Sequence, residues 1–124
     1  MPWQVSIAPG SPFVETTYSG VLTPPELADA VRKTLRQAGT HGLKRFFADC
    51  TPLEGGHSIL DLYTLADSLA KGDLSAVERE AVLLPALPAP AENVQFWETA
   101  CLNRGLNVRI FLDRELAVAW LLEP

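Results

Sequence analysis

Two short segments at the start of the chain have the pattern of strands. In residues 3–8 every second side chain is apolar, as in a strand with one buried face. Residues 13–19 are rich in β-branched and aromatic side chains, and the Pro-Gly-Ser-Pro sequence of residues 9–12 separates the two segments. We therefore expect an antiparallel hairpin.

Four later segments have the spacing of amphipathic helices, at 23–38, 58–69, 92–104 and 113–122. Thr23 and Ser58 each precede an acidic residue by three positions, which predicts capping boxes, and Asp113 can cap the last helix. The side chains expected to face the core are Leu27, Val31, Leu35 and Ala38, then Leu62, Ala66 and Leu69, then Val94, Trp97 and Cys101 beside Phe96 and Ala100, and finally Leu116, Ala117, Trp120 and Leu121.

Three further strands are predicted between the helices, at 44–50, 81–84 and 107–112. Residues 85–90 contain three prolines and are expected to form a stiff connector. Residues 73–80 are ambiguous, because the box from Ser75 to Glu78 could begin a short helical turn. A hairpin followed by alternating helices and strands predicts one α/β domain over residues 1–124, with a mixed five-stranded sheet whose later strands are parallel and about four helices.

Composition narrows the function. The chain has 124 residues, of which 48% are hydrophobic and 20% charged, with a net charge of −5. These values are typical of a packed domain and argue against nucleic acid as a partner. Neither a signal peptide nor an apolar run long enough to span a membrane is recognised, and two cysteines in apolar surroundings suggest free thiols in a reducing compartment. We therefore expect a cytoplasmic protein.

Several phrases carry a resemblance to a known family. They are Tyr18-Ser-Gly-Val-Leu-Thr, Phe46-Phe-Ala-Asp49, Asn103-Arg-Gly-Leu-Asn-Val-Arg-Ile-Phe-Leu-Asp113 and Ala119-Trp120-Leu121. Together with the order of elements they resemble the SpoIIAA-like family, relatives of the STAS domains of anti-sigma-factor antagonists. The resemblance covers nearly the whole chain. It implies a five-stranded sheet with helices, no cofactor, and a role in binding a protein or a small ligand.

The stretch from residue 49 to residue 58 is the candidate binding site. In the antagonists that the chain resembles, a phosphorylatable serine in an Asp-Ser-Ser-Gly motif begins the helix after the central strand. That motif is missing here, and Ser58 stands nearest to the acceptor position. Open α/β sheets bind ligands beyond the carboxyl ends of their strands, near helix N-termini. The residues predicted to meet a partner or ligand are Asp49, Thr51, Gly55, Gly56, His57 and Ser58.

Other interpretations remain open. Ser58 and the two glycines can serve only to cap a helix and shape a turn. Cys50 with His57 and Asp61 could form a thiol-dependent enzyme, whereas a cysteine at the end of an apolar strand is more often inert. His41 and His57 are isolated, so no metal site is predicted.

Aromatic residues suggest two more possibilities. Trp97, Trp120, Phe96 and Phe111 could line a pocket for an apolar, lipid-like ligand between the last two helices and the sheet, or could simply be core. Trp3 could support a homodimer if it is exposed, although its alternation with Val5 and Ile7 fits the core equally well. The favoured prediction is a non-enzymatic, STAS-like binding or regulatory module that meets its partner or ligand through residues 49–58.

Overall fold

The computed structural model describes residues 2–124 and is built around a five-stranded sheet with the strand order β1-β2-β4-β6-β7. The strands are Trp3–Ser6 (β1), Val14–Tyr18 (β2), Arg45–Asp49 (β4), Arg79–Leu83 (β6) and Val108–Phe111 (β7). Strands β1 and β2 are antiparallel, and all other neighbours are parallel. The mixed sheet and the N-terminal hairpin predicted from the sequence are confirmed.

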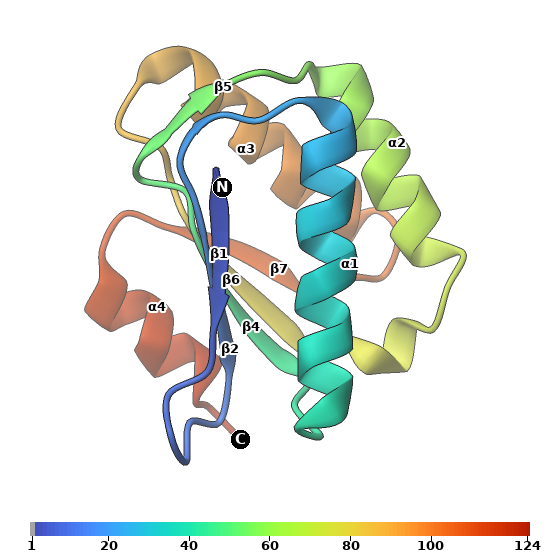
Figure 1. Cartoon of the computed structure of the whole chain (residues 1–124), viewed down its shortest axis with the longest axis vertical. Helices are drawn as coiled ribbons and strands as arrows, with labels where there is room; N and C mark the ends of the chain where they lie inside the picture. The colour runs from blue at the N-terminus through green and yellow to red at the C-terminus, as the bar shows by residue number, and fades with distance from the viewer. Residues whose placement is uncertain (1) are drawn as a thin grey trace.

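Helices cover both faces of this sheet (Figure 1). They are Pro24–Thr40 (α1), Ile59–Ala70 (α2), Pro88–Leu102 (α3) and Arg114–Leu121 (α4). Helices α1, α2 and α3 pack on one face, and α4 packs alone on the other. The predicted capping boxes at the starts of α1 and α2 are both formed, and the Asp113 side chain caps α4. No helix in residues 2–124 has the length and apolar character needed to cross a membrane.

A second, two-stranded sheet lies within segments that the sequence predicted to be loops. Gly20–Val21 (β3) runs parallel to Leu53–Gly55 (β5), which follows the third predicted strand. Both segments leave the carboxyl ends of adjacent strands, β2 and β4, so the chain can pair them as they travel toward α1 and α2. Segments of two and three residues are too short to show alternation, which is why the pattern missed them.

One predicted helix boundary is wrong, and the structure decides the segment that the sequence left ambiguous. Helix α3 begins at Pro88, inside the expected connector, because a proline suits the first turn of a helix, where no backbone N–H is required. The ambiguous segment contains a single 3₁₀ turn, Leu74–Ala76, capped by Asp73. The box proposed from Ser75 to Glu78 does not form, since Ser75 bonds to Asp73 and Glu78 forms an ion pair with Arg45.

Most of the predicted core positions are buried or partly buried, one is exposed, and one of the two alternatives for Trp3 is confirmed. Leu116 is 63% exposed, because only Ala117 and Leu121 of α4 are buried against the sheet. Trp3 is only 9% exposed and lies beneath the ammonium group of Lys33 on α1, so it is a core residue and offers no exposed aromatic surface for a dimer.

Candidate ligand-binding cavity

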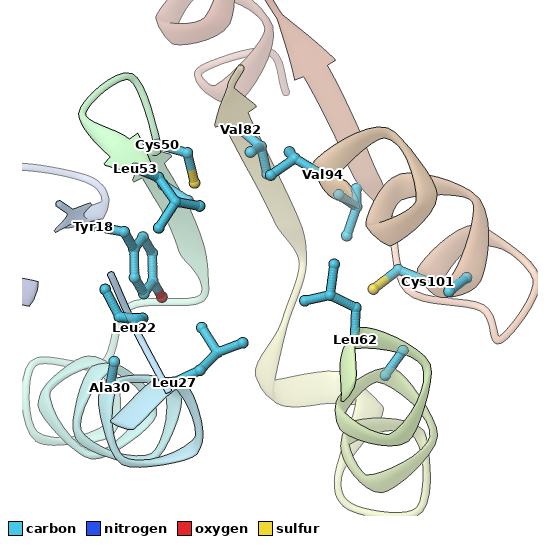
Figure 2. Packing of buried hydrophobic residues seen from close by; sticks show 14 of the residues in the cluster. Tyr18, Leu22, Leu27, Ala30, Cys50, Leu53, Leu62, Val82, Val94 and Cys101 are labelled. Atoms are coloured by element: carbon cyan, nitrogen blue, oxygen red, sulfur yellow. The ribbon is translucent and has the colours of Figure 1, made fainter. Parts of the chain in front are cut away.

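Two adjoining cavities lie between the sheet and helices α1, α2 and α3, with volumes of about 60 and 50 Å³. Tyr18, Val31, Glu80 and Trp97 line both of them, so the two spaces meet at these four residues. Figure 2 shows Tyr18 and Leu53 approaching this part of the core from one side, with Leu62 and Val82 on the other. Each cavity is large enough for water or a few non-hydrogen atoms of a ligand.

The first cavity is the nearer of the two to the predicted site. Its lining combines residues that follow β4 with residues of the three helices and of the sheet. They are Tyr18, Leu27, Val31, Ala48, Cys50, Leu53, His57, Leu62, Leu65, Glu80, Val82, Val94 and Trp97. The second cavity continues deeper, toward Phe46, Leu106 and Val108. Nearly all of the lining atoms are therefore carbon, with a few polar groups among them.

Glu80 is the carboxylate of this lining. It lies in β6, where Ala81 and Leu83 face α4 and Glu80 and Val82 face the cavities. One carboxylate oxygen, Oε1, accepts a hydrogen bond of 2.9 Å from the indole Nε1 of Trp97. Burial raises the pKa of Glu80, and the hydrogen bond from Trp97 opposes this only in part. The apolar surroundings therefore favour the neutral carboxylic acid.

The neighbours of Glu80 respond to the same surroundings. The pKa of the Tyr18 hydroxyl is raised well above its ordinary value, first by burial and then by the nearby Glu80 and Cys50. Burial also raises the pKa of the Cys50 thiol, and Glu80 and Asp49 add to the shift. Cys101 behaves in the same way. These three groups stay protonated near neutral pH, which leaves Glu80 as the group in this cluster with the lowest barrier to ionisation.

Residues 20–22 and 53–57, which include the second sheet, form what we call the roof of the first cavity, and Leu53 and His57 line the cavity from this side. Leu22 donates its N–H to the carbonyl oxygen of Gly55 at 2.9 Å, and the ring Nδ1 of His57 donates to the carbonyl oxygen of Leu22 at 3.1 Å. Gly56 has a φ of +106°, and a Cβ atom placed there would collide with the backbone of Leu22. Only glycine therefore allows the two segments to approach so closely. Asn93 of α3 completes the roof by donating to the carbonyl oxygen of His57 at 3.2 Å.

The six residues predicted to bind a ligand take different positions. His57 lines the first cavity, and its neighbours in the chain Cys50 and Leu53 do so as well. Gly55 and Gly56 shape the roof. The other three are engaged in local contacts: Asp49 accepts from the backbone and hydroxyl of Thr51 at 3.0 and 2.7 Å, and Ser58 is exposed and forms the capping box of α2 with Asp61.

The proposed thiol set is not arranged for catalysis in this structure. Cys50 is 7% exposed, and its raised pKa opposes formation of the thiolate that a nucleophile needs. The Asp61 carboxylate accepts from the N–H and hydroxyl of Ser58, and these bonds lower its pKa. Both cysteines are free thiols, as expected. In the part of the chain that the structure describes, no three His, Cys, Asp or Glu residues are grouped to hold a metal ion.

The predicted aromatic pocket is divided between the two faces of the sheet. Trp97 lines both cavities, whereas Trp120 of α4 packs against Phe111 of β7 on the opposite face, with ring centroids 5.7 Å apart. The residues that sequence reasoning missed are Tyr18 and Glu80. The fourth strand was predicted to begin at Ala81, but it begins at Arg79, so the prediction left Glu80 outside it. A longer predicted strand would have placed a carboxylate among apolar residues, which is an uncommon position that can indicate a functional site.

Comparison with known proteins supports the architecture. No protein-family model matches the sequence, and no curated protein matches it at a significant level. The structure is similar to that of an uncharacterised DUF3478-family protein with a SpoIIAA-like fold from Shewanella loihica PV-4. The two are 18% identical, with a TM-score of 0.55, and the match covers 96% of this chain and 91% of that one. The chain therefore has a SpoIIAA-like fold, as the resemblance in its sequence implied.

Proposed function

We propose that the chain is a non-enzymatic, STAS-like module that binds a small, mostly apolar ligand in the two cavities between the sheet and helices α1, α2 and α3. The observation that carries this proposal is the lining of the first cavity, where Cys50, Leu53 and His57 of the predicted binding segment meet Glu80 and Trp97 of the core. Pockets lined mainly by carbon with a few polar groups are the usual form of a small-ligand site. This refines the apolar-carrier interpretation, with the site on the α1–α3 face.

The size of the cavities limits the ligand. A dry cavity of about 150 Å³ is known to accept benzene, so spaces of about 60 and 50 Å³ suit a ligand of roughly four to six non-hydrogen atoms. A ligand of that size gains at most about 1.5 kcal/mol per non-hydrogen atom, which gives micromolar affinity at best. A small effector or metabolite fits this range better than a long lipid.

Nuclear magnetic resonance tests the proposal directly. Isobutanol should shift the indole N–H signal of Trp97, which borders both cavities, and leave that of Trp120 on the opposite face unchanged. The variant Ala48→Leu, which fills the first cavity, should abolish the shift of the Trp97 signal. The matched variant Val118→Ile, on α4 at the opposite face of the sheet, should keep it. Equal shifts of both indole signals, or none at saturating isobutanol, would disprove the proposal.

The thiol-enzyme alternative has its own test. Because burial and nearby carboxylates keep the Cys50 thiol protonated, iodoacetamide should label the folded protein far more slowly than it labels free cysteine at neutral pH. Labelling of Cys50 faster than free cysteine, slowed by His57→Ala, would establish an activated thiol and overturn the non-enzymatic proposal.

A protein partner at the same end of the molecule is the second candidate. Leu60, in the first turn of α2, is 70% exposed, and Val21 of β3 is 61% exposed. These two apolar side chains flank the predicted binding segment. Leu60→Glu should then reduce recovery of a specific partner in a pull-down from the native cytoplasm, whereas Leu112→Glu, beside α4, should not. Identical recovery with both variants would exclude this surface.

A further inference from the structure

We infer that the ligand is a small apolar amine, bound as its ammonium ion, with the carboxylate of Glu80 as its counter-ion at the junction of the two cavities. This inference rests on the proposed function, since it names the class of molecule that the cavities would hold.

The charge of the lining points to a cation. Among the residues that line the two cavities, Glu80 carries the sole carboxylate, and there is no lysine or arginine. Its pKa is raised by burial without an opposing contribution from a basic side chain. An ammonium ion that enters must therefore bring Glu80 into its ionised form, with the carboxyl proton released to water or transferred to an amine that enters uncharged, and the resulting ion pair offsets that cost. An anionic ligand would find no lysine or arginine in the lining to offset its charge.

The Glu80 carboxylate can accept more hydrogen bonds than it receives from the protein. Trp97 Nε1 donates to Oε1, and this is the single hydrogen bond to the carboxylate found within residues 2–124. Tyr18, which carries a hydroxyl group, lines both cavities together with Glu80, and Thr34 lines the second. A primary ammonium group has three donors and no acceptor, and it can therefore satisfy the carboxylate and a neighbouring hydroxyl oxygen together.

The rest of the lining fits the other part of such a molecule. Leu62, Val82 and Val94 supply aliphatic contacts in the first cavity, and Leu106 and Val108 do so in the second. Tyr18 and Trp97 place aromatic side chains at the junction, and aromatic groups beside a carboxylate are a recurrent arrangement for organic cations. A chain of about four carbon atoms matches the available volume.

A neutral alcohol is the chief competitor. Glu80 in its protonated form could exchange hydrogen bonds with a hydroxyl group, and such a ligand would pay less for desolvation. The alcohol, however, offers no positive charge. An ammonium ion does, and in apolar surroundings its attraction to an ionised Glu80 is far stronger than in water, which offsets the cost of ionising the carboxyl group. The charge of the ligand is therefore the property to vary.

Three probes of equal length test the inference: n-butylamine, n-butanol and butyrate. Their binding can be followed through the methyl signals of Leu62 and Val82, which border the first cavity. At neutral pH, butylamine should bind about tenfold more tightly than butanol, and butyrate should not bind. Glu80→Gln should remove the preference for the amine, because glutamine keeps the acceptor for Trp97 but has no charge. Glu92→Gln, an exposed change on α3, is the matched control and should preserve it.

The outcomes separate the two proposals. Equal binding of butylamine and butanol, or an amine preference that survives Glu80→Gln, would overturn the amine inference and leave the cavity as a ligand site. Failure of all three probes to shift the methyl signals would count against the proposed function itself. If Glu80→Gln does not fold, Glu80→Asp serves in its place. Because it retains the charge at a shorter reach, it should keep a reduced preference for the amine, and complete indifference between amine and alcohol would again refute the inference.

Discussion

The two faces of the main sheet are packed in different ways, although the same strands supply both. Between α4 and the sheet, Phe47, Ala81, Leu83 and Ala117 surround Leu121, and all are at most 5% exposed. On the other face, α1, α2 and α3 leave two cavities against Glu80 and Val82. Alternate residues of β6 therefore face two layers: a filled layer between the sheet and α4, and a hollow layer, which contains the cavities, between the sheet and α1, α2 and α3. The comparison suggests that the α4 face supports the fold, and the α1–α3 face can take up a ligand at a smaller cost in stability.

The filled layer is also fastened at its edge. Arg45 donates to the carbonyl oxygens of Leu121 and Glu123 at 2.7 and 2.8 Å, and Arg79 donates to that of Trp120 at 2.6 Å. These guanidinium groups, one each from the neighbouring strands β4 and β6, satisfy carbonyl groups at the C-terminal end of α4, where a helix has no internal donors left. The hollow layer has its polar contacts in the roof and at Glu80 instead.

The largest expected effect compares the same substitution in the two layers. Leu121→Ala, at the fully buried last residue of α4, should lower the free energy of unfolding by about 4–5 kcal/mol, because it opens a new cavity in close packing. Leu62→Ala, beside an existing cavity, should cost only about 2–3 kcal/mol, because fewer contacts are lost. Urea unfolding of the two variants measures both values. An equal loss, or a greater one for Leu62→Ala, would contradict the contrast between the layers.

The second prediction concerns the roof of the hollow layer. Gly56→Ala should destabilise the protein by about 1–3 kcal/mol, because a φ of +106° is strained for alanine and its Cβ would push against Leu22. Gly39→Ala is the control. It lies in α1 with open space around its Cβ and should stabilise by about 0.5–1 kcal/mol. No change in thermal unfolding for Gly56→Ala would show that the close approach of Leu22 and residue 56 is not required.

The third prediction concerns pH and Glu80, which lines both cavities of the hollow layer. Burial raises the pKa of Glu80 above its value in the unfolded chain, so folding favours the protonated form. The stability that this group contributes is complete below the unfolded pKa and is lost as the pH rises toward the folded one. Glu80→Gln should therefore match the wild-type protein in acid and exceed it in stability at neutral pH, by about 1.4 kcal/mol for each unit of pKa shift.

This difference is best measured as the melting temperature of Glu80→Gln minus that of the wild-type protein across the acid to neutral range. Lowered carboxylate pKa values, such as those of Asp61, Asp67 and Glu78, make both proteins less stable in acid and cancel in the difference. Tyr18, Cys50 and Cys101 remain protonated throughout. A flat profile for Glu80→Gln would mean that the carboxylate is not desolvated.

The sequence predicted what depends on local pattern and missed what depends on the meeting of distant segments. The capping boxes of Thr23 and Ser58 were predictable because both partners lie within one turn. The pairing of β3 with β5 was not, because it joins residues 33 and 34 positions apart in the chain through very short strands. The cavities depend on how three helices pack over alternate strand residues, so only His57 of the predicted binding set was found at their lining.

The smallest expected effect lies at the rim of the hollow layer. Ser58 caps α2, with its hydroxyl oxygen accepting from the Asp61 N–H at 3.2 Å. Ser58→Ala should therefore lower stability by about 1 kcal/mol, whereas Ser58→Asp should stay within roughly 0.5 kcal/mol of the wild-type protein, because aspartate also caps. Thermal unfolding distinguishes the two.

If Ser58 is a phospho-acceptor as the sequence suggested, Ser58→Asp should in addition alter recovery of a partner in a pull-down, since it adds negative charge to an exposed position beside the roof. A normal set of partners, together with unchanged stability, would limit the role of Ser58 to capping.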